Sequence, residues 1–125
     1  MEKIHKEILG LMGKIDIDCK DVGDVIVIEL AGQLDVYNSG DLARLVDAYI
    51  NRGFKKFAVD LERVTYWDSS TLSVLINCLK KMDQEQGGFV LASLQGSPKE
   101  VFEMAKLQQV FKLFPSIDDA LNAMG

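Results

Sequence analysis

The sequence predicts a single α/β domain, because segments with the two-residue period of strands alternate along it with segments that have the 3.6-residue period of helices. The chain has 125 residues, which is enough for one domain with its own core, and 48% of them are hydrophobic while 26% are charged. We therefore expect an α/β fold with a mixed sheet of about four to five strands and an N-terminal hairpin, covered by about four helices.

The first two strands are expected to form the hairpin. Residues 14–19, KIDIDC, alternate apolar and charged side chains as a half-exposed strand does. Residues 20–24 then make a turn in which Gly23 supplies the backbone freedom. Residues 25–32, VIVIELAG, are apolar almost throughout, which is typical of a more deeply buried strand.

Residues 1–13 precede the hairpin and form an N-terminal extension, so the domain itself is expected to span residues 14–125. The apolar side chains of the extension have near-helical spacing, at Ile4, Ile8, Leu11 and Met12. Two interpretations stay open: a short amphipathic helix that packs on the domain or on a neighbour, or a frayed end.

The first helix and the third strand follow the hairpin. Residues 41–51, DLARLVDAYIN, carry a helical apolar stripe, and Asn38 or Ser39 is the expected N-cap. The segment 55–61, KKFAVDL, has the alternation of a strand, and the β-branched and aromatic residues 63–67, RVTYW, extend it. The extended chain therefore leads directly into Asp68.

The remaining elements continue the alternation. A second apolar stripe runs from Leu72 to Met82, and the glycines at 87–88 stop that helix. Residues 87–94, GGFVLASL, indicate a buried strand, and a serine followed by proline and glutamate starts a helix near residue 97. A short extended segment at 113–115 precedes a last helix that begins near Ser116.

Charge and hydropathy exclude two classes of partner. The chain has 14 Lys and Arg against 19 Asp and Glu, a net charge of −5, and this acidic background would repel phosphate backbones. No apolar run approaches the ~18 residues of a membrane-spanning helix, and the N-terminus lacks the features of a secretory signal. We expect a cytoplasmic protein that binds no nucleic acid and does not insert into membranes.

The reactive side chains do not form a recognisable catalytic or metal pattern. Cys19 and Cys78 lie on apolar faces and are predicted to be buried thiols. His5, the single histidine, lies outside the predicted domain, and glycine-rich phosphate-binding motifs are absent from the sequence. The sequence therefore predicts a protein that is not an enzyme and that has no metal and no cofactor.

One segment remains as a candidate site: WDSSTLSVL, residues 67–75, where an acid and two hydroxyls precede an amphipathic helix. In one interpretation Asp68 or Ser69 only caps the helix, which is worth about 1 kcal/mol. In the other, a serine at a helix N-terminus is a phosphorylation site, where a phosphate adds about −1.5 to −2 charge beside exposed N–H groups.

Two segments give the sequence a family resemblance. GQLDVYNSGDL, residues 32–42, is similar to the loop before the first helix of STAS domains, and AVDLERVTYWDSSTLSVL, residues 58–75, is similar to their strand that ends in Asp-Ser-(Ser/Thr)-Gly-Leu-Gly. The likeness extends from about residue 14 to the C-terminus. The chain resembles the stand-alone anti-sigma-factor antagonists of this family, which implies a STAS-like single domain.

The resemblance implies a phosphorylation switch in transcription regulation. The serine after the aspartate, Ser69 here, is the residue that an anti-sigma factor serine kinase phosphorylates and a PP2C-type phosphatase restores. The unphosphorylated form binds the anti-sigma factor and releases the sigma factor. The implied partner-binding surface consists of Asp35, Tyr37, Asn38, Asp68, Ser69, Ser70 and Thr71. We expect a monomer or weak dimer.

Three positions depart from the family pattern. Gln33 stands where the family has an acid, and Thr71 and Ser73 replace the glycines of Gly-Leu-Gly. A threonine adds a β-branched side chain at a point of close approach. The alternative function is therefore a constitutive STAS interaction subunit of a lipid-transport or signalling assembly, without phospho-switching; a small-ligand or nucleotide site beside the loops is a third hypothesis.

Overall fold

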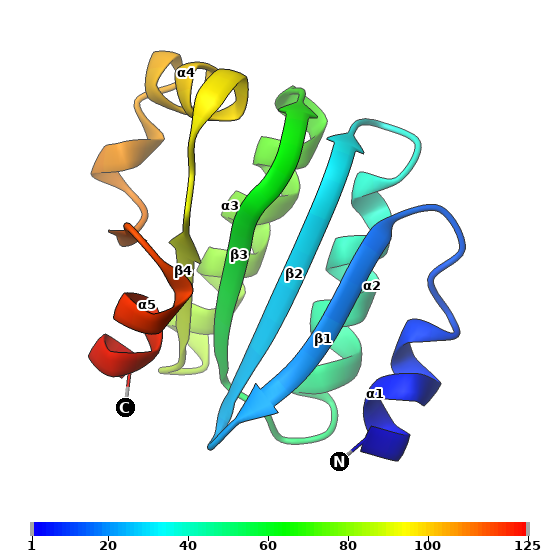
Figure 1. The fold of residues 1–125 in the computed structure, drawn as a ribbon. Coiled ribbons are helices and arrows are strands. Elements are labelled where there is room, and N and C mark those ends of the chain that lie inside the picture. The colour runs from blue at the N-terminus through cyan, green and yellow to red at the C-terminus, as the bar shows by residue number, and fades with distance from the viewer. Residues whose placement is uncertain (1, 125) are drawn as a thin grey trace.

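The computed structural model describes residues 2–124 and has one mixed sheet with helices on both faces (Figure 1). The elements are, in order, α1 (Glu2–Leu9), β1 (Asp16–Val22), β2 (Val25–Leu34), α2 (Ser39–Ile50), β3 (Lys56–Trp67), α3 (Ser69–Gln84), β4 (Gly88–Ala92), α4 (Gly96–Met104), the 3-10 turn η1 (Leu107–Gln109), β5 (Leu113–Phe114) and α5 (Ile117–Met124). The predicted α/β class is confirmed.

The five strands lie in the order of the sequence, β1-β2-β3-β4-β5. β1 and β2 pair antiparallel across the turn at Gly23, which has a φ of +60°, while all other neighbours are parallel. The predicted mixed sheet with an N-terminal hairpin is therefore confirmed. Each parallel pair is joined by a helix, as parallel strands require.

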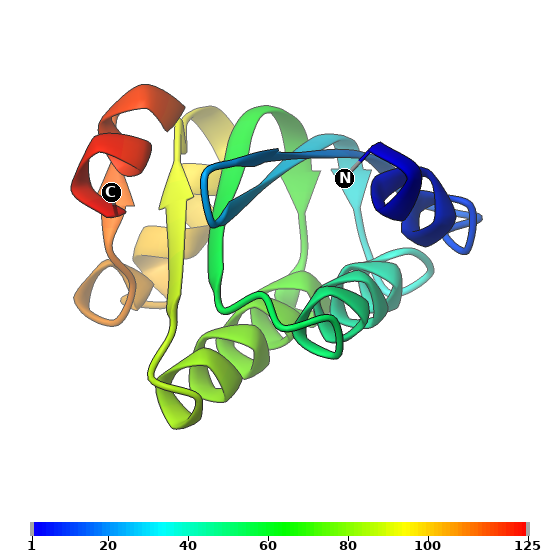
Figure 2. The same cartoon turned by 90° about the horizontal axis from the view of Figure 1, so that it is seen from below.

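The main core lies between the sheet and the layer formed by α2, α3 and α4 (Figure 2). Inward side chains of β3, such as Phe57 and Val59, meet Leu45 of α2 and Leu75 of α3 there. Most of the apolar side chains predicted to face inward are buried here, because one face of the sheet and one stripe of each helix must leave water together.

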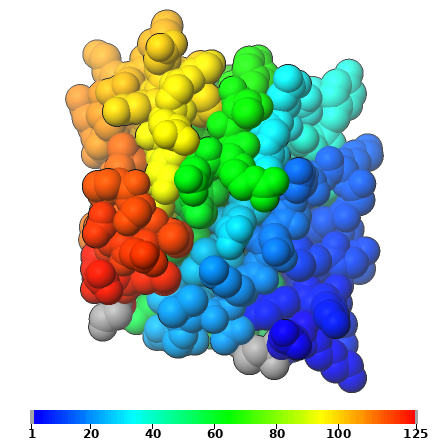
Figure 3. Space-filling model, in the orientation of Figure 1, coloured from blue at the N-terminus to red at the C-terminus, as the bar shows by residue number. Residues whose placement is uncertain are grey.

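The other face of the sheet has a smaller cover. Ala120 of α5 packs over Val25, Ala58, Val90 and Ala92 in a second apolar cluster. Figure 3 shows that α5 lies over one side of this face, whereas β1 and β2 reach the surface beside it. None of the helices within residues 2–124 is long and apolar enough to cross a membrane.

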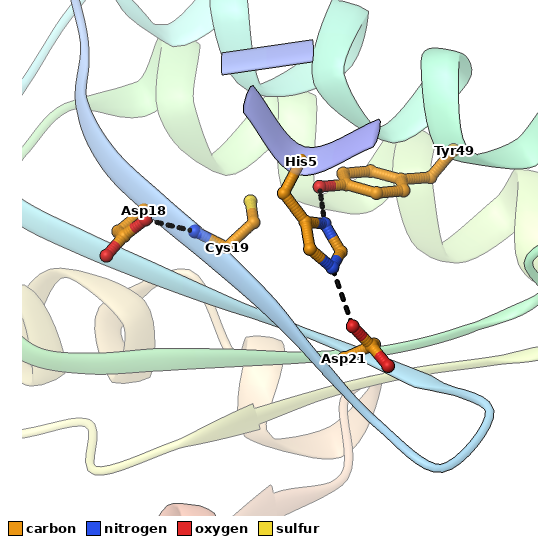
Figure 4. Close-up of polar contacts among 5 residues, drawn as sticks. All are labelled: His5, Asp18, Cys19, Asp21 and Tyr49. Atoms are coloured by element: carbon orange, nitrogen blue, oxygen red, sulfur yellow. Dashed lines mark hydrogen bonds and ion pairs between the residues drawn. The ribbon is translucent and has the colours of Figure 1, made fainter. Parts of the chain in front are cut away.

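Helix α1 packs against the edge of the domain, beside β1 and α2 (Figures 1 and 4). The imidazole of His5 hydrogen-bonds through Nδ1 to the Tyr49 hydroxyl at 2.6 Å and through Nε2 to the Asp21 carboxylate at 2.7 Å. Ile8 is fully buried in the main core. The N-terminal segment thus shares the core of the domain. His5 helps to hold it there through its two hydrogen bonds, a role that its position in the sequence did not reveal.

Both cysteines are buried free thiols, as predicted. Cys19 lies on the inner face of β1, beside the residues that hold α1 (Figure 4). Cys78 lies on the inward stripe of α3. Burial raises the pKa of each thiol to about 12, which disfavours the reactive thiolate.

Candidate functional site

The candidate site forms where two neighbouring parallel strands end. Leu34 at the end of β2 is paired with Trp67 at the end of β3. The chain leaves both strands at the same edge of the sheet, so the loop of residues 35–38 and the start of α3 are brought side by side (Figure 1). Loops at the carboxyl ends of parallel strands are where α/β domains commonly place their binding residues.

Asp68 caps α3. Its backbone is extended, and its carboxylate accepts hydrogen bonds from the backbone N–H groups of Ser70 and Thr71, at 3.0 and 3.3 Å. The Ser70 hydroxyl also donates to this carboxylate, at 2.5 Å. The Ser70 hydroxyl is the main reason why the pKa of Asp68 is lowered, and backbone N–H groups add to the effect. Asp68 therefore carries a negative charge at neutral pH.

Ser69 is the first residue of α3, and its side chain is exposed. Its carbonyl accepts a hydrogen bond from the Ser73 hydroxyl at 3.0 Å, so Ser73 binds back within the helix. Because the Asp68 carboxylate already accepts hydrogen bonds from free N–H groups at the start of α3 and is held by the Ser70 hydroxyl, capping does not require the Ser69 hydroxyl. The side chain of Ser69 is thus accessible to a modifying enzyme.

The loop of residues 35–38 is fixed by its own polar groups. The Asp35 carboxylate accepts from the Tyr37 backbone N–H, and the Asn38 side chain accepts from the Asp35 N–H and donates to the Gln33 carbonyl, each at 2.9 Å. Tyr37 projects outward and is 79% exposed. The loop therefore presents an aromatic ring on a firmly held backbone.

The predicted N-cap position of α2 is confirmed, but the capping hydrogen bond is not made. Asn38 occupies the N-cap position but makes no side-chain capping hydrogen bond, because its amide is used to close the preceding loop. Ser39 lies in the first turn of α2, and its hydroxyl is 3.4 Å from that of Ser70. The hydroxyl that was expected to cap one helix thus connects α2 to α3.

Thr71 was expected on the partner-binding surface but lies in the interior. Its side chain is fully buried, so it does not lie on the surface with Tyr37 and Ser69. The reason is helical period, since Thr71 precedes Leu75 and Cys78 on the stripe of α3 that faces the core. Within residues 2–124 its hydroxyl has no hydrogen-bond partner.

The site thus brings together most of the residues expected from the sequence. Tyr37 and Ser69 are exposed, Asp35, Asn38, Asp68 and Ser70 are half-buried around them, and Thr71 lies beneath. Sequence reasoning missed the contribution of Val36, which is 68% exposed and whose backbone N–H adds slightly to the lowering of the pKa of Asp68. Among the described residues no cluster of three His, Cys, Asp or Glu side chains could hold a metal ion.

The chain is similar to known proteins in sequence and in fold. The model of the STAS domain family matches residues 16–120. A Thermotoga maritima protein with the provisional name of anti-sigma factor antagonist is 28% identical over 104 residues, which cover 82% of this chain and 92% of that protein. The anti-sigma-B factor antagonist of Listeria monocytogenes is 28% identical over 99 residues, which cover 79% of this chain and 86% of that protein.

A solved structure shares the fold over nearly its whole length. The crystal structure of a Thermotoga maritima protein, also provisionally named an anti-sigma factor antagonist, superposes with a TM-score of 0.81 at 27% identity. The match covers 86% of this chain and 93% of that one.

Proposed function

The chain belongs to the STAS domain family, and from this membership we propose that it is an anti-sigma factor antagonist whose binding is switched off by phosphorylation of Ser69. The unphosphorylated protein binds an anti-sigma factor and thereby releases the sigma factor. The observation that carries the proposal is the exposed Ser69 next to a helix cap that is complete without it.

The electrostatics of the site favour such a switch. Asp68 is ionised at neutral pH, as aspartate is at its ordinary pKa of about 3.9, and the Ser70 hydroxyl and nearby N–H groups lower that pKa further. A phosphate on Ser69 would add about −1.5 to −2 charge directly beside it. A charge left unpaired in an interface costs several kcal/mol, so the modified surface would bind its partner far more weakly without any change of fold.

The unmodified surface suits protein docking. Val36 and Tyr37 are two large apolar side chains exposed on one short loop beside Ser69. Exposed apolar groups with a polar rim are typical of sites where another protein binds. The half-buried polar groups of Asp35, Asn38 and Ser70 supply that rim.

Two enzymes would set the state of the switch. The anti-sigma factor is itself a serine kinase that transfers a phosphoryl group from ATP to the Ser69 hydroxyl, and a PP2C-type phosphatase removes it by hydrolysis. The chain acts as substrate and binding partner rather than as an enzyme. We place it in the cytoplasm, where sigma factors and ATP are present.

The proposal is tested by incubating the purified protein with the anti-sigma kinase of the same organism and ATP, followed by mapping of the phosphate by mass spectrometry. We expect one phosphate, on Ser69, and none on a Ser69→Ala variant. Ser70→Ala is the matched control, because it removes the neighbouring hydroxyl and leaves Ser69 in place. Phosphate on Ser70 alone, or on neither serine, would contradict the proposal.

A second candidate function is a constitutive STAS interaction subunit without a phospho-switch. Thr71 and Ser73, which stand in the place of two family glycines in the first turn of α3, favour it. In that case a Ser69→Asp variant would bind its partner as tightly as the unmodified protein. A transporter ATPase recovered by both forms would favour this function over the switch.

A further inference from the structure

A groove of about 420 Å³ lies across the loop of residues 35–38 from Ser69, between the N-terminal segment and the start of α2. We call it the Leu11 groove, and its main lining side chains are Leu11, Lys14, Val36, Tyr37 and Arg44. Val36 and Tyr37 also belong to the surface beside Ser69. The groove therefore continues the proposed docking surface on the side away from α3.

The N-terminal wall of this groove is fixed at both ends. On one side, α1 is held by His5 and Ile8, and the Leu11 N–H donates to the Ile8 carbonyl at 3.1 Å. On the other, the Lys14 N–H donates to a carboxylate oxygen of Asp41 at 3.1 Å. Leu11 is therefore presented at a defined position over α2 rather than on a loose terminus.

Three large apolar side chains are exposed around the groove. Leu11 is 69% exposed, which adds to the exposed Val36 and Tyr37 of the facing loop. They come from segments more than twenty residues apart, and only the docking of α1 brings them together. Clustered exposure of this kind is typical of protein interaction sites.

The charge of the groove is opposite to that of the whole chain. The side chains of Lys14 and Arg44 are exposed there, while the only acid in the lining, Asp41, is buried and bonded to the Lys14 N–H and to Arg44. The chain as a whole has a net charge of −5. The groove is therefore a basic site on an acidic protein, which suits an acidic partner segment.

We propose that the Leu11 groove receives a segment of the anti-sigma factor in which a large apolar side chain stands next to a carboxylate. The apolar side chain packs between Leu11 and Tyr37, and the carboxylate pairs with Lys14 and Arg44. The proposal rests on the proposed function and extends it, because it makes the N-terminal segment part of the partner-binding surface.

The test is calorimetric titration of the anti-sigma kinase into variants of the full chain that change only exposed side chains. We expect Leu11→Ser and Lys14→Glu each to weaken binding on the order of tenfold, the usual effect of removing one central contact. Lys14→Glu leaves the backbone hydrogen bond to Asp41 intact. Matched controls on the opposite side of the domain are Val110→Ser and Lys112→Glu, which should leave the affinity unchanged.

The outcomes separate this inference from the proposed function. If the kinase binds and phosphorylates the protein but Leu11→Ser and Lys14→Glu bind like the controls, the groove proposal is wrong and the switch at Ser69 stands. If the kinase does not bind the unmodified protein, the proposed function fails. Self-association of the chain that Leu11→Ser abolishes, measured by sedimentation, would assign the groove to a second copy and overturn the proposal.

Discussion

The Ser70 hydroxyl donates a hydrogen bond to the Asp68 carboxylate at 2.5 Å, and this contact gives two adjacent serines different roles. Ser70 and Asp68 complete the start of α3, while the exposed Ser69 is left available for modification. The two interpretations of the sequence, a helix cap and a phosphorylation site, are therefore compatible because they use different side chains.

Replacing Asp68 with alanine should destabilise the domain. The variant removes the acceptor for two backbone N–H groups at the start of α3, and loss of such a cap typically costs about 1 kcal/mol. The measurement is urea unfolding followed by circular dichroism. The free energy of unfolding of Ser69→Ala should be within error of that of the original protein. An equal loss of stability in both variants would show that Ser69 shares the cap.

A negative charge at residue 69 should weaken partner binding without altering the fold. We expect Ser69→Asp to bind the anti-sigma kinase at least tenfold more weakly, since it places a second carboxylate beside the ionised Asp68. Ser69→Ala should bind normally. Asn122→Asp adds the same charge on α5 and is the control; if it weakened binding equally, the effect would come from net charge alone.

The Thr71→Val variant should be more stable than the original protein. The Thr71 hydroxyl is buried and has no hydrogen-bond partner among the described residues, and a buried hydroxyl without a partner costs about 1 to 3 kcal/mol. Valine keeps the shape and removes this cost. We expect a gain of about 1 kcal/mol in the free energy of unfolding. A clear loss of stability would mean that the hydroxyl makes a bond in solution.

The contact between His5 and Asp21 should stabilise the protein in a pH-dependent way. The hydrogen bond from His5 lowers the pKa of the Asp21 carboxyl. The ionised form is favoured in the folded state, so this stabilisation is present above the ordinary pKa of about 3.9 and is lost as the pH falls through the lower folded value.

The Asp21→Asn variant tests this dependence. Thermal unfolding at several pH values should show the variant less stable than the original protein at pH 7, with the difference shrinking below about pH 4. Asp24→Asn is a matched control, because Asp24 is an exposed acid in the adjacent turn whose ion pair, among the described residues, is with the half-buried Lys56. A difference for Asp21→Asn that is constant across pH would show that ionisation is not involved.

The two thiols should be nearly inert in the folded protein. Burial raises the pKa of both Cys19 and Cys78 from 9.0 to about 12, so very little thiolate exists at neutral pH. We expect alkylation to be at least a hundredfold slower than in urea, measured by mass spectrometry. Faster reaction of Cys19 than of Cys78 would indicate that β1 and α1 open locally.

Much of the fold could be predicted from the sequence because it depends on local pattern. The alternation of KIDIDC and the turn at Gly23 predicted the β1–β2 hairpin, and the stripe from Leu72 to Met82 predicted α3. Cys78, predicted to be a buried thiol, lies in the core, whereas Ile76 and Leu79 of the same helix are only partly buried. The spacing of apolar residues shows which face of a helix is apolar, but it does not show how deeply the residues at the margins of that face are buried.

The candidate site was predicted less completely. Asp68 and Ser69 could be placed at a helix start from the sequence, since capping is a local interaction. Thr71 lies on the core-facing stripe of α3, so its burial follows from the helical period of the sequence. The contact of Ser39 with Ser70 depends on how α2 and α3 pack against the sheet. No local pattern carries that information.

The sequence by itself determined the α/β class, the hairpin, and the helix start at Asp68 with a serine beside it, because each follows from hydrophobic period or from hydrogen bonds between near neighbours. Only the tertiary structure decided which residues form one surface. The parallel pairing of β2 with β3 brings residues 35–38 to Ser69, and the buried bonds of His5 bring Leu11 to Tyr37. These are contacts between segments far apart in the chain, and they form only when a shared core holds those segments together.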